Sequence, residues 1–479
     1  MEKNTKNHTG MIIKKPPVGF AALALIGPSF VWAAEYIGSG EVVIATRTGA
    51  ILGIAVLWAV VIGVFLKFWI GVSGARYTVC TGEGMIDMFS RTPGPRNWAV
   101  WLVMVVQIFC AVLSIGTLAA SSGAFIHSLI PGVDMKVCGW FAAFFAVAVA
   151  WSGVFSVLKI VMSIFVLIVV LGAFYIAAHV LPGFTELLKG FTLSVPAVPD
   201  WAVGVEEVSD SAWEEILPVL GWGAGGFASQ VWCTYWVIGA GYGATAGRGY
   251  GKAADVASLR RMSSEAAKRI KGWCRVLYMD SALAMVLGIA VTAAFLISGA
   301  GILGVEKIVP SNDDMAQTLS RVFSARWDKL GGFIFRLCGA VAMVSTMVGQ
   351  LAGWPRLLAD SCRICIRGFD RRFAWKTQFR GFLIFFFVTS MVVVFVLGLR
   401  PIFLLKLSSV LEGVLLTGLQ AILVAVGLFI IMPKMLSKEA YEILRPSKIF
   451  AVGLIITAIF FGYVCVVHIP AMLMQLFNW

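Results

Sequence analysis

Charged residues are scarce in this chain. They make up 13% of its 479 residues, whereas 59% are hydrophobic and the mean hydropathy is +0.90. A water-soluble domain needs more polar surface than this composition supplies, so the scarcity excludes a soluble globular protein. It indicates instead a polytopic membrane protein whose main partner is the lipid bilayer.

Residues that ligate metals or carry catalysis are also few. Nine cysteines are scattered along the chain, and the one Cys-x-x-Cys pair, Cys362 and Cys365, has no second pair at zinc-site spacing. The four histidines lie in the N-terminal tail or near the ends of apolar runs: His8, His127, His179 and His468. We therefore expect no enzyme and no resident cofactor.

The net charge of +13 would raise the question of nucleic acid in a soluble protein. Here the Lys and Arg residues lie in segments between apolar runs, where they set the orientation of a membrane protein. We expect no nucleic-acid partner.

Runs of about 20 apolar residues are long enough to cross the hydrocarbon core of a bilayer. Eleven are read at 19–46, 52–74, 97–126, 138–155, 159–181, 216–240, 274–299, 328–355, 381–399, 402–432 and 449–469. The predicted fold is an all-α integral membrane protein of eleven transmembrane helices. A tail, 1–18, precedes a single transmembrane domain, 19–479.

Basic residues predict the orientation of this domain. The tail and the segments after every second span hold 26 Lys and Arg when Lys159, at the start of the fifth span, is included, against 7 on the opposite side. Because cytoplasmic loops carry the excess of basic residues, the N-terminus is expected in the cytoplasm and the C-terminus outside. We expect a multi-pass, monomeric protein of the cell membrane.

The first span is interrupted by Gly38, Ser39 and Gly40, and Glu41 follows directly. Glycines at membrane depth are tolerated where the freed backbone lines a cavity or is buried in protein. A carboxylate facing lipid would cost roughly 2.5–3.5 kcal/mol on insertion scales. Glu41 is therefore predicted to face a polar site.

The sixth span repeats this pattern. Four glycines fall within six residues from Gly221 to Gly226, and polar or small residues follow. Interrupted spans at corresponding positions of two halves indicate a central binding site between them, whereas close helix packing is the alternative role for such glycines. From this span we predict substrate contacts at Ala224, Gly225, Phe227, Ser229 and Gln230.

Several motifs resemble those of the Nramp metal-ion transporters. They are GPSF from Gly27, the interruption eleven residues later, the pair Leu57-Trp58 and the loop RYTVCTGEG after the second span. The resemblance implies the inverted-repeat fold of LeuT, with a first repeat at about 19–181, a second at about 216–432 and an extra helix at about 449–469. It also implies transport of Mn²⁺ or Fe²⁺ together with protons.

The chain departs from the family pattern at the site itself. On the resemblance, the family's metal-binding Asp and Asn fall on Gly38 and Glu41, and its Met and His fall on Phe227 and Ser229. Glu41 is thus the one predicted metal-binding side chain. Oxygen ligands suit Mg²⁺ and Mn²⁺, and softer metals prefer thioether sulfur, so we expect Mn²⁺ and Mg²⁺ ahead of Fe²⁺.

Other ionisable residues lie within the spans. Glu35 is a candidate proton relay or partner of a neighbouring cation, and Lys67 and Arg336 are candidate partners, because intramembrane charges usually pair. Lys406 and Glu412 in the tenth span are a second candidate pair.

The sequence therefore predicts an ion-coupled secondary transporter of divalent metal ions with alternating access around both breaks. Two alternatives stay open: a transporter of the same fold for a small non-metal solute or anion, and a non-transporting membrane protein used for sensing or assembly.

Overall fold

The computed structural model describes residues 13–17, 19, 27–205, 208–310, 315–396 and 401–476. Within these ranges all regular structure is helical and no strand is present. The elements are α2 (Pro28–Tyr36), η1 (Gly40–Ala45), α3 (Thr46–Leu52), η2 (Gly53–Val56), α4 (Leu57–Thr81), α5 (Met85–Ser90), α6 (Trp98–Leu129), α7 (Met135–Ala150), α8 (Phe155–Ala178), α9 (Phe184–Lys189), α10 (Trp213–Trp222), α11 (Phe227–Ala240), η3 (Gly243–Thr245), α12 (Val256–Arg260), α13 (Ser264–Ser298), η4 (Gly299–Gly304), α14 (Met315–Cys365), α15 (Phe369–Arg372), α16 (Trp375–Val396), α17 (Pro401–Val410), η5 (Leu411–Leu415), α18 (Thr417–Val426), η6 (Gly427–Ile431), α19 (Met432–Met435), α20 (Lys438–Leu444) and α21 (Lys448–Leu476).

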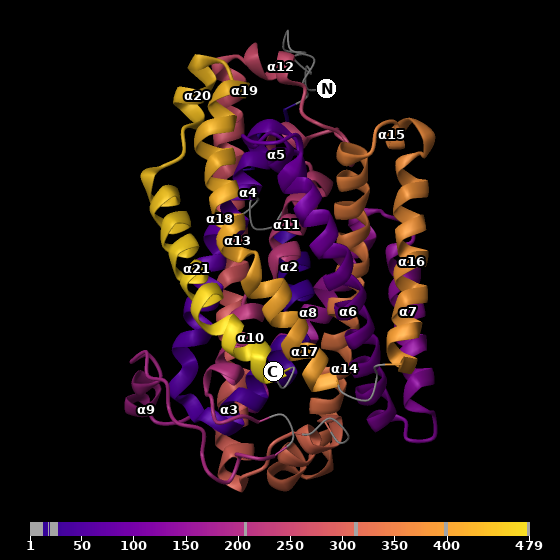
Figure 1. Ribbon diagram of the computed structural model, residues 1–479, viewed down its shortest axis with the longest axis vertical. Helices are drawn as coiled ribbons and strands as arrows, with labels where there is room; N and C mark the ends of the chain where they lie inside the picture. The colour runs from indigo at the N-terminus through magenta and orange to yellow at the C-terminus, as the bar shows by residue number, and fades with distance from the viewer. Residues whose placement is uncertain are drawn as a thin grey trace.

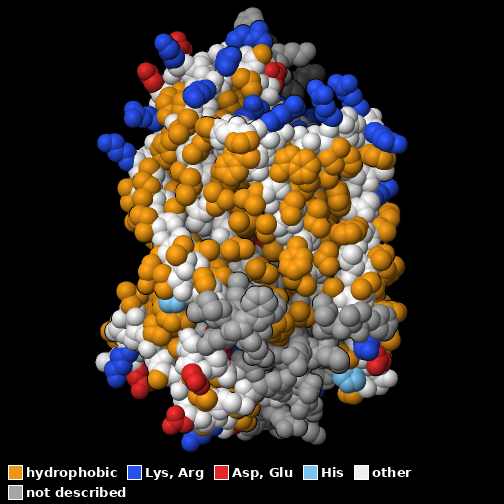
Figure 2. Space-filling model, in the orientation of Figure 1, with side chains coloured by type: hydrophobic (Ala, Val, Ile, Leu, Met, Phe, Trp, Pro, Cys, Tyr) orange, Lys and Arg blue, Asp and Glu red, His pale blue; other side chains and the backbone are white. Residues whose placement is uncertain are grey.

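Eight helical stretches in the described ranges are long and apolar enough to cross a membrane: Gly40–Thr81, Trp98–Leu129, Phe155–Ala178, Ser264–Gly304, Gly332–Cys365, Trp375–Val394, Ile402–Met435 and Lys448–Pro470. The apolar helix α7 is shorter, at 16 residues. Figure 2 shows hydrophobic side chains around the whole middle of the visible face, as expected for a surface that lipid covers. The chain is thus a multi-pass membrane protein, as predicted.

The helices form one bundle around a short central set. In Figure 1, α2, α10 and α11 lie inside, between α16 at one edge and α21 at the other. Helix α6 packs on α14, α7 and α16, while α4 packs on α13, α11 and α21. The core is continuous through the bundle, because one buried hydrophobic cluster contains residues from nearly every long helix.

The two ends of the bundle differ in charge. One end carries α5, α12, α15 and α20, and the other carries α3 and α9. Blue side chains crowd the first end, whereas the second shows both signs in smaller number (Figure 2).

Candidate functional site

The first span breaks where the sequence predicts. Helix α2 starts after Gly27 with Pro28 at its first position, where the missing N–H of proline costs no hydrogen bond. It ends at Tyr36, Ile37 is extended, and the chain becomes helical again at Gly40. A Cβ on Gly38 would overlap the Thr346 hydroxyl, so glycine is required there by the close approach of α14.

The second break separates α10 from α11. Ala224 and Gly225 have φ of 58° and 72°, in the left-handed region that favours glycine. The two breaks adjoin, because a Cβ on Gly40 would lie 2.5 Å from the Cβ of Trp222, and one on Gly225 would lie 3.1 Å from the Cβ of Tyr36.

Glu41 is fully buried, and its side chain bonds back to the backbone of the first break. Its Oε2 accepts a hydrogen bond of 2.7 Å from the backbone N–H of Gly38. This places the carboxylate at the start of η1, where the positive end of a helix stabilises negative charge. Its other oxygen, Oε1, has no hydrogen-bond partner among the described residues.

Glu35 and Ser229 join the two broken spans. The Ser229 hydroxyl donates a 2.5 Å hydrogen bond to Glu35 Oε2. The Trp32 indole donates in turn to Ser229 Oγ at 3.1 Å. Glu35 therefore fixes α2 against α11 across the breaks, and its carboxylate interacts electrostatically with that of Glu41.

A third carboxylate lies at the breaks that sequence reasoning did not place there. Glu412, in η5, accepts a 2.7 Å hydrogen bond through Oε1 from the backbone N–H of Ala228, at the start of α11. Its Oε2 has no partner among the described residues. A Cβ on Gly226 would overlap this side chain, so the glycine admits the carboxylate.

The expected pair of Lys406 with Glu412 is wrong. Lys406 instead forms an ion pair of 2.6 Å with Glu215, in the first turn of α10. The presence of both charges in one span suggested a pair, but Glu412 lies in the π-helical turn η5 and contacts α11 instead. The signal that could have revealed it is the coincidence of an intramembrane acid with the glycine-rich start of α11.

Amide side chains complete the polar lining. Gln230 donates from Nε2 to the carbonyl of Ala224 at 2.7 Å, and Gln420 donates to the carbonyl of Phe227 at 3.0 Å. Each keeps an unpartnered Oε1 among the described residues. The side chain of Phe227 packs on Phe89, with ring centroids 6.2 Å apart.

Lys67 lies on α4, and its side chain is fully buried beside the second break. Its ammonium donates to the carbonyl of Gly221 and, at 3.1 Å, to the carbonyl of Gly225. The ring of Phe461 lies 5.5 Å from the nitrogen. Lys67 interacts electrostatically with both Glu41 and Glu412.

The predicted residues Ser39 and Arg336 differ in whether they lie at the two breaks. Ser39 is buried at the first break, directly before η1. Arg336 donates to the carbonyls of Ser128 at 2.8 Å and Gly332 at 3.1 Å. The structure therefore does not bring Arg336 to Glu35. The sequence indicates how deep Arg336 lies in its span, but it does not indicate which neighbouring helix the side chain faces.

The groups that could hold a cation at the breaks are all oxygens. The described part of the chain contains no group of three or more His, Cys, Asp or Glu residues placed to hold a metal. What lies at the breaks is a set of carboxylates, backbone carbonyls and side-chain amides, the ligands that Mg²⁺, Mn²⁺ and Ca²⁺ prefer. The site residues are buried on all sides.

A buried ionic cluster closes one end of the bundle. Glu215, at the start of α10, contacts Lys406 at 2.6 Å and Arg47 at 3.3 Å. Arg47 also donates to the carbonyl of Pro310 at 2.6 Å. We call Arg47, Glu215 and Lys406 the α3-end cluster, and it links α3, α10 and α17.

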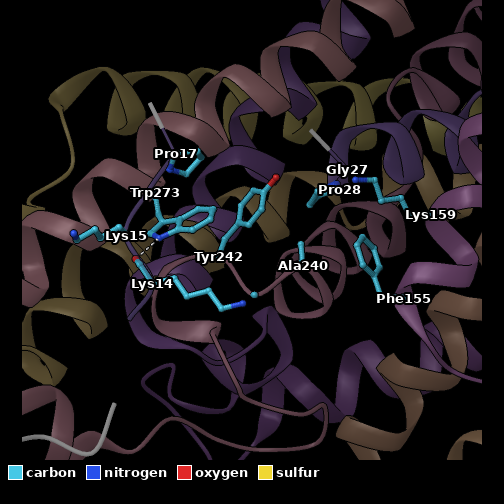
Figure 3. A pocket seen from close by; sticks show the side chains of 11 residues that line it. Lys14, Lys15, Pro17, Gly27, Pro28, Phe155, Lys159, Ala240, Tyr242 and Trp273 are labelled. Atoms are coloured by element: carbon cyan, nitrogen blue, oxygen red, sulfur yellow. Dashed lines mark hydrogen bonds between the residues drawn. The ribbon is translucent and has the colours of Figure 1, made fainter. Parts of the chain in front are cut away.

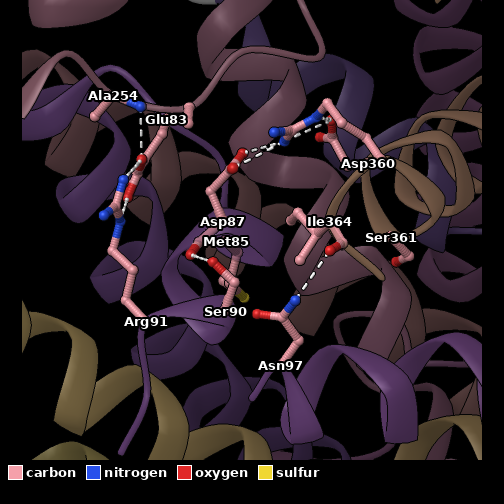
Figure 4. Close-up of polar contacts among 12 residues, drawn as sticks. Glu83, Met85, Asp87, Ser90, Arg91, Asn97, Ala254, Asp360, Ser361 and Ile364 are labelled. Carbon is pink, nitrogen blue, oxygen red and sulfur yellow. Dashed lines mark hydrogen bonds and ion pairs between the residues drawn. The ribbon is translucent and has the colours of Figure 1, made fainter. Parts of the chain in front are cut away.

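A second ionic network lies at the opposite end (Figure 4). Glu83 contacts Arg91 at 2.7 Å and accepts from the N–H of Ala254 at 2.6 Å. Separately, Arg363 bridges Asp87 at 2.8 Å and Asp360 at 3.1 Å. Tyr235 of α11 donates to Asp360 at 2.9 Å.

These residues form what we call the α5-end network: Glu83, Asp87, Arg91, Tyr235, Asp360 and Arg363. Burial raises the pKa of Asp87 to about 7, although the neighbouring guanidinium of Arg363 opposes the rise.

A cavity of about 300 Å³ lies beside the start of α2 (Figure 3). Three lysines line it, Lys14, Lys15 and Lys159, and the Trp273 indole donates to the carbonyl of Lys14 at 2.9 Å. Its cationic lining contains none of the residues at the breaks, so it is a separate feature from the candidate site.

Comparison with known proteins gives both local and global similarity. A family model, natural resistance-associated macrophage protein-like (Nramp), matches residues 29–205. The divalent metal cation transporter MntH of Yersinia enterocolitica is 33% identical over 81 residues, 17% of this chain and 20% of that protein. The same transporter of Pectobacterium carotovorum is 32% identical over 81 residues. The chain thus matches about a fifth of the length of these curated relatives.

Solved structures share the fold over almost the whole chain. A variant of the manganese transporter of Eremococcus coleocola aligns over 97% of this chain and 90% of its own, with a TM-score of 0.69 at 15% identity. A nucleobase-cation-symport-1 family transporter, Mhp1, aligns over 97% and 95% with a TM-score of 0.51 at 14% identity. The Nramp-like sequence match is thus confined to residues 29–205, whereas the fold of these transporters is shared over almost the whole chain.

Proposed function

We propose that this protein is an ion-coupled secondary transporter of divalent metal ions, with Mn²⁺ and Mg²⁺ ahead of Fe²⁺. The observation that carries the proposal is the meeting of two broken helices around buried carboxylates. Glu41 and Glu412 each bind the start of a half-helix through one oxygen and keep the other oxygen unpartnered. Broken helices that meet at membrane depth are how many secondary transporters build their binding sites.

The named relatives support a metal cargo. Both MntH proteins are divalent metal cation transporters by name, and the Eremococcus protein is a manganese transporter. These names favour metal transport over an organic solute carrier or a non-transporting sensor.

The local chemistry supports hard cations within that class. Phe227 stands where the family resemblance expects a sulfur ligand, and its side chain packs on Phe89. Two carboxylates with carbonyl and amide oxygens provide a site for Mg²⁺ or Mn²⁺ that keeps part of its hydration shell. In this proposal Glu41 and Glu412 contact the ion, and Gln230, Ser229 and the backbone from Gly38 to Gly40 line its site.

We further propose the architecture that this function needs. Eleven spans would form a first repeat at about 19–181, a second at about 216–432 and an extra helix at about 449–469, in a monomer in the cell membrane. The basic end seen in Figure 2 would face the cytoplasm together with the N-terminus, and the C-terminus would lie outside.

Alternating access requires that both sides of the site open in turn. The α3-end cluster and the α5-end network link broken-helix elements to their neighbours on opposite sides of the breaks. We assign the first as the outer gate and the second as the cytoplasmic gate. Because both are formed here, this proposal assigns the structure to an occluded state.

Uptake by proteoliposomes tests the proposal. The purified full chain should accumulate Mn²⁺ and Mg²⁺ above empty liposomes, and a panel of small organic solutes and anions should not be accumulated. Uptake of an organic solute without any of the metals, by correctly folded protein, would contradict it.

A further inference from the structure

Lys67 is held in an unusual position for a buried intramembrane cation. Charged side chains in the interior of a membrane protein normally pair with an opposite charge. Among the described residues Lys67 forms no such ion pair, although Glu41 and Glu412 are near enough to interact with it electrostatically. Its ammonium contacts backbone carbonyls instead.

The carbonyls that bind Lys67 belong to a cation-binding end of a helix. Gly221 is in the last turn of α10, which ends at Trp222, and Gly225 is in the unwound segment that follows. The carboxyl end of a helix carries partial negative charge that stabilises cations. Unwound carbonyls at such ends are the groups that coordinate ions in transporters built from broken helices.

The ammonium of Lys67 occupies both of these carbonyls. It has three N–H donors and no acceptor. Two donors go to the carbonyls of Gly221 and Gly225, and the ring of Phe461 lies 5.5 Å from the nitrogen. The carbonyls are therefore satisfied by an internal cation.

The carboxylates beside it are not satisfied in the same way. Glu41 Oε1 and Glu412 Oε2 are buried and form no hydrogen bond of ordinary geometry with a described residue, although the side chain of Thr292 lies near Glu41 and that of Gln107 near Glu412. A permanent strut would place the ammonium on one of these oxygens, since a buried ion pair requires close contact to offset desolvation. Lys67 already occupies the carbonyls of Gly221 and Gly225, whereas one oxygen of Glu41 and one of Glu412 remain able to bind a second cation.

We propose that Lys67 is a built-in competitor of the transported cation. In the cargo-free protein its ammonium occupies the carbonyls of Gly221 and Gly225, and a divalent cation binds beside Glu41 and Glu412 by displacing it. The flexible four-carbon stem of lysine allows the ammonium to withdraw and return. Its return would then help to expel the ion, and this inference rests on the proposed metal transport.

The test is to remove the charge while keeping the length of the side chain. The full-length protein with Lys67→Met should bind Mn²⁺ at least about tenfold more tightly than the wild type by titration calorimetry, a difference of ~1.4 kcal/mol. Lys67→Arg keeps the charge, so its Mn²⁺ affinity should not exceed that of the wild type. Lys434→Met removes an exposed lysine of α19 and should leave the affinity unchanged.

Turnover gives a second measurement. Because the returning ammonium helps release, Lys67→Met should lower the KM for Mn²⁺ uptake and also lower kcat. If Lys67→Met does not fold, Lys67→Gln serves in its place, since it is neutral and its amide can still donate to the carbonyls.

Unchanged or weaker Mn²⁺ binding by the folded neutral variants would overturn the competitor role, even if the wild type transports Mn²⁺. A wild type that neither binds nor transports Mn²⁺, Mg²⁺ or Fe²⁺ would instead overturn the proposed function. In that case, Mn²⁺ binding by Lys67→Met alone would still support competition, and its absence would overturn both.

Discussion

The carboxylates of Glu41 and Glu412 are held at the two breaks by the same kind of hydrogen bond. Glu41 and Glu412 each accept one backbone N–H at the start of a half-helix, which orients the carboxylate and stabilises its charge. Each leaves one buried oxygen without a partner in the described part of the chain. A buried oxygen without a hydrogen bond lowers the stability of the folded protein. We expect a bound cation to offset this loss.

At the scale of single residues, Glu41→Gln should abolish Mn²⁺ uptake, or lower it by at least about tenfold, because the amide cannot replace the negative charge that binds the ion. The glutamine oxygen can still accept the N–H of Gly38, so the melting temperature should stay close to that of the wild type. Uptake by proteoliposomes and thermal unfolding in detergent measure the two effects.

Glu442→Gln is the matched control, since Glu442 is exposed on α20. It should leave both uptake and melting temperature unchanged. Normal uptake by a well-folded Glu41→Gln protein would remove Glu41 from the ion site.

Helix α10 shows at the scale of elements how the site is connected to the ends of the bundle. Glu215 at its start binds Arg47 of α3 and Lys406 of α17, and the carbonyl of Gly221 in its last turn binds Lys67 of α4. Helix α11 continues the connection, because Tyr235 binds Asp360 in the α5-end network. A movement at either break would therefore reach both ionic clusters.

The α3-end cluster should stabilise the closed outer side. Glu215→Gln leaves Arg47 and Lys406 buried without their acid, and breaking a buried ion pair typically costs about 3–5 kcal/mol. We expect a lower melting temperature, together with faster labelling of a cysteine placed at Ser39 from the outer side. Glu186→Gln, at an exposed position of α9, should change neither measurement.

The α5-end network should make stability depend on pH. Burial raises the pKa of Asp87 to about 7, against about 3.9 in an unfolded chain. Between these values the folded protein keeps a proton that the unfolded chain has lost, so this contribution to stability falls as the pH rises from about 4 to about 7.

We therefore expect Asp87→Asn to flatten the dependence of the melting temperature on pH between about 5 and 7, because asparagine has no proton to release. Asp370→Asn, at an exposed position of α15, is the control and should keep the slope of the wild type. Identical slopes in all three proteins would show that Asp87 titrates at its ordinary value.

The features of the site that are local in the sequence could be predicted, and those that depend on helix packing could not. Glycines at both breaks and the acid beside the first are local features, and the structure has the helix ends there. Glu412 lies far along the chain from Glu41, and its contact with α11 depends on how α17 and η5 pack. Arg336 and Lys406 show the same limit, because a span reveals the depth of a charge but not the neighbour it faces.

For the whole molecule, the distribution of basic residues implies a direction across the membrane. Positions that the proposal assigns to opposite sides are Arg371 on α15 and Gly132 between α6 and α7, and both are exposed. In intact cells, an impermeant thiol reagent should label Gly132→Cys but not Arg371→Cys. Permeabilised cells should show labelling of both. Labelling of Arg371→Cys in intact cells would reverse the proposed orientation.

We propose, from the fold and from the side chains at the breaks, that a divalent cation binds where the two broken helices adjoin. Anomalous diffraction from crystals grown with Mn²⁺ tests it most directly. We predict a manganese peak between the breaks, coordinated by carboxylate oxygens of Glu41 and Glu412. A peak elsewhere in the bundle, or none in a protein that transports Mn²⁺ in proteoliposomes, would contradict the account.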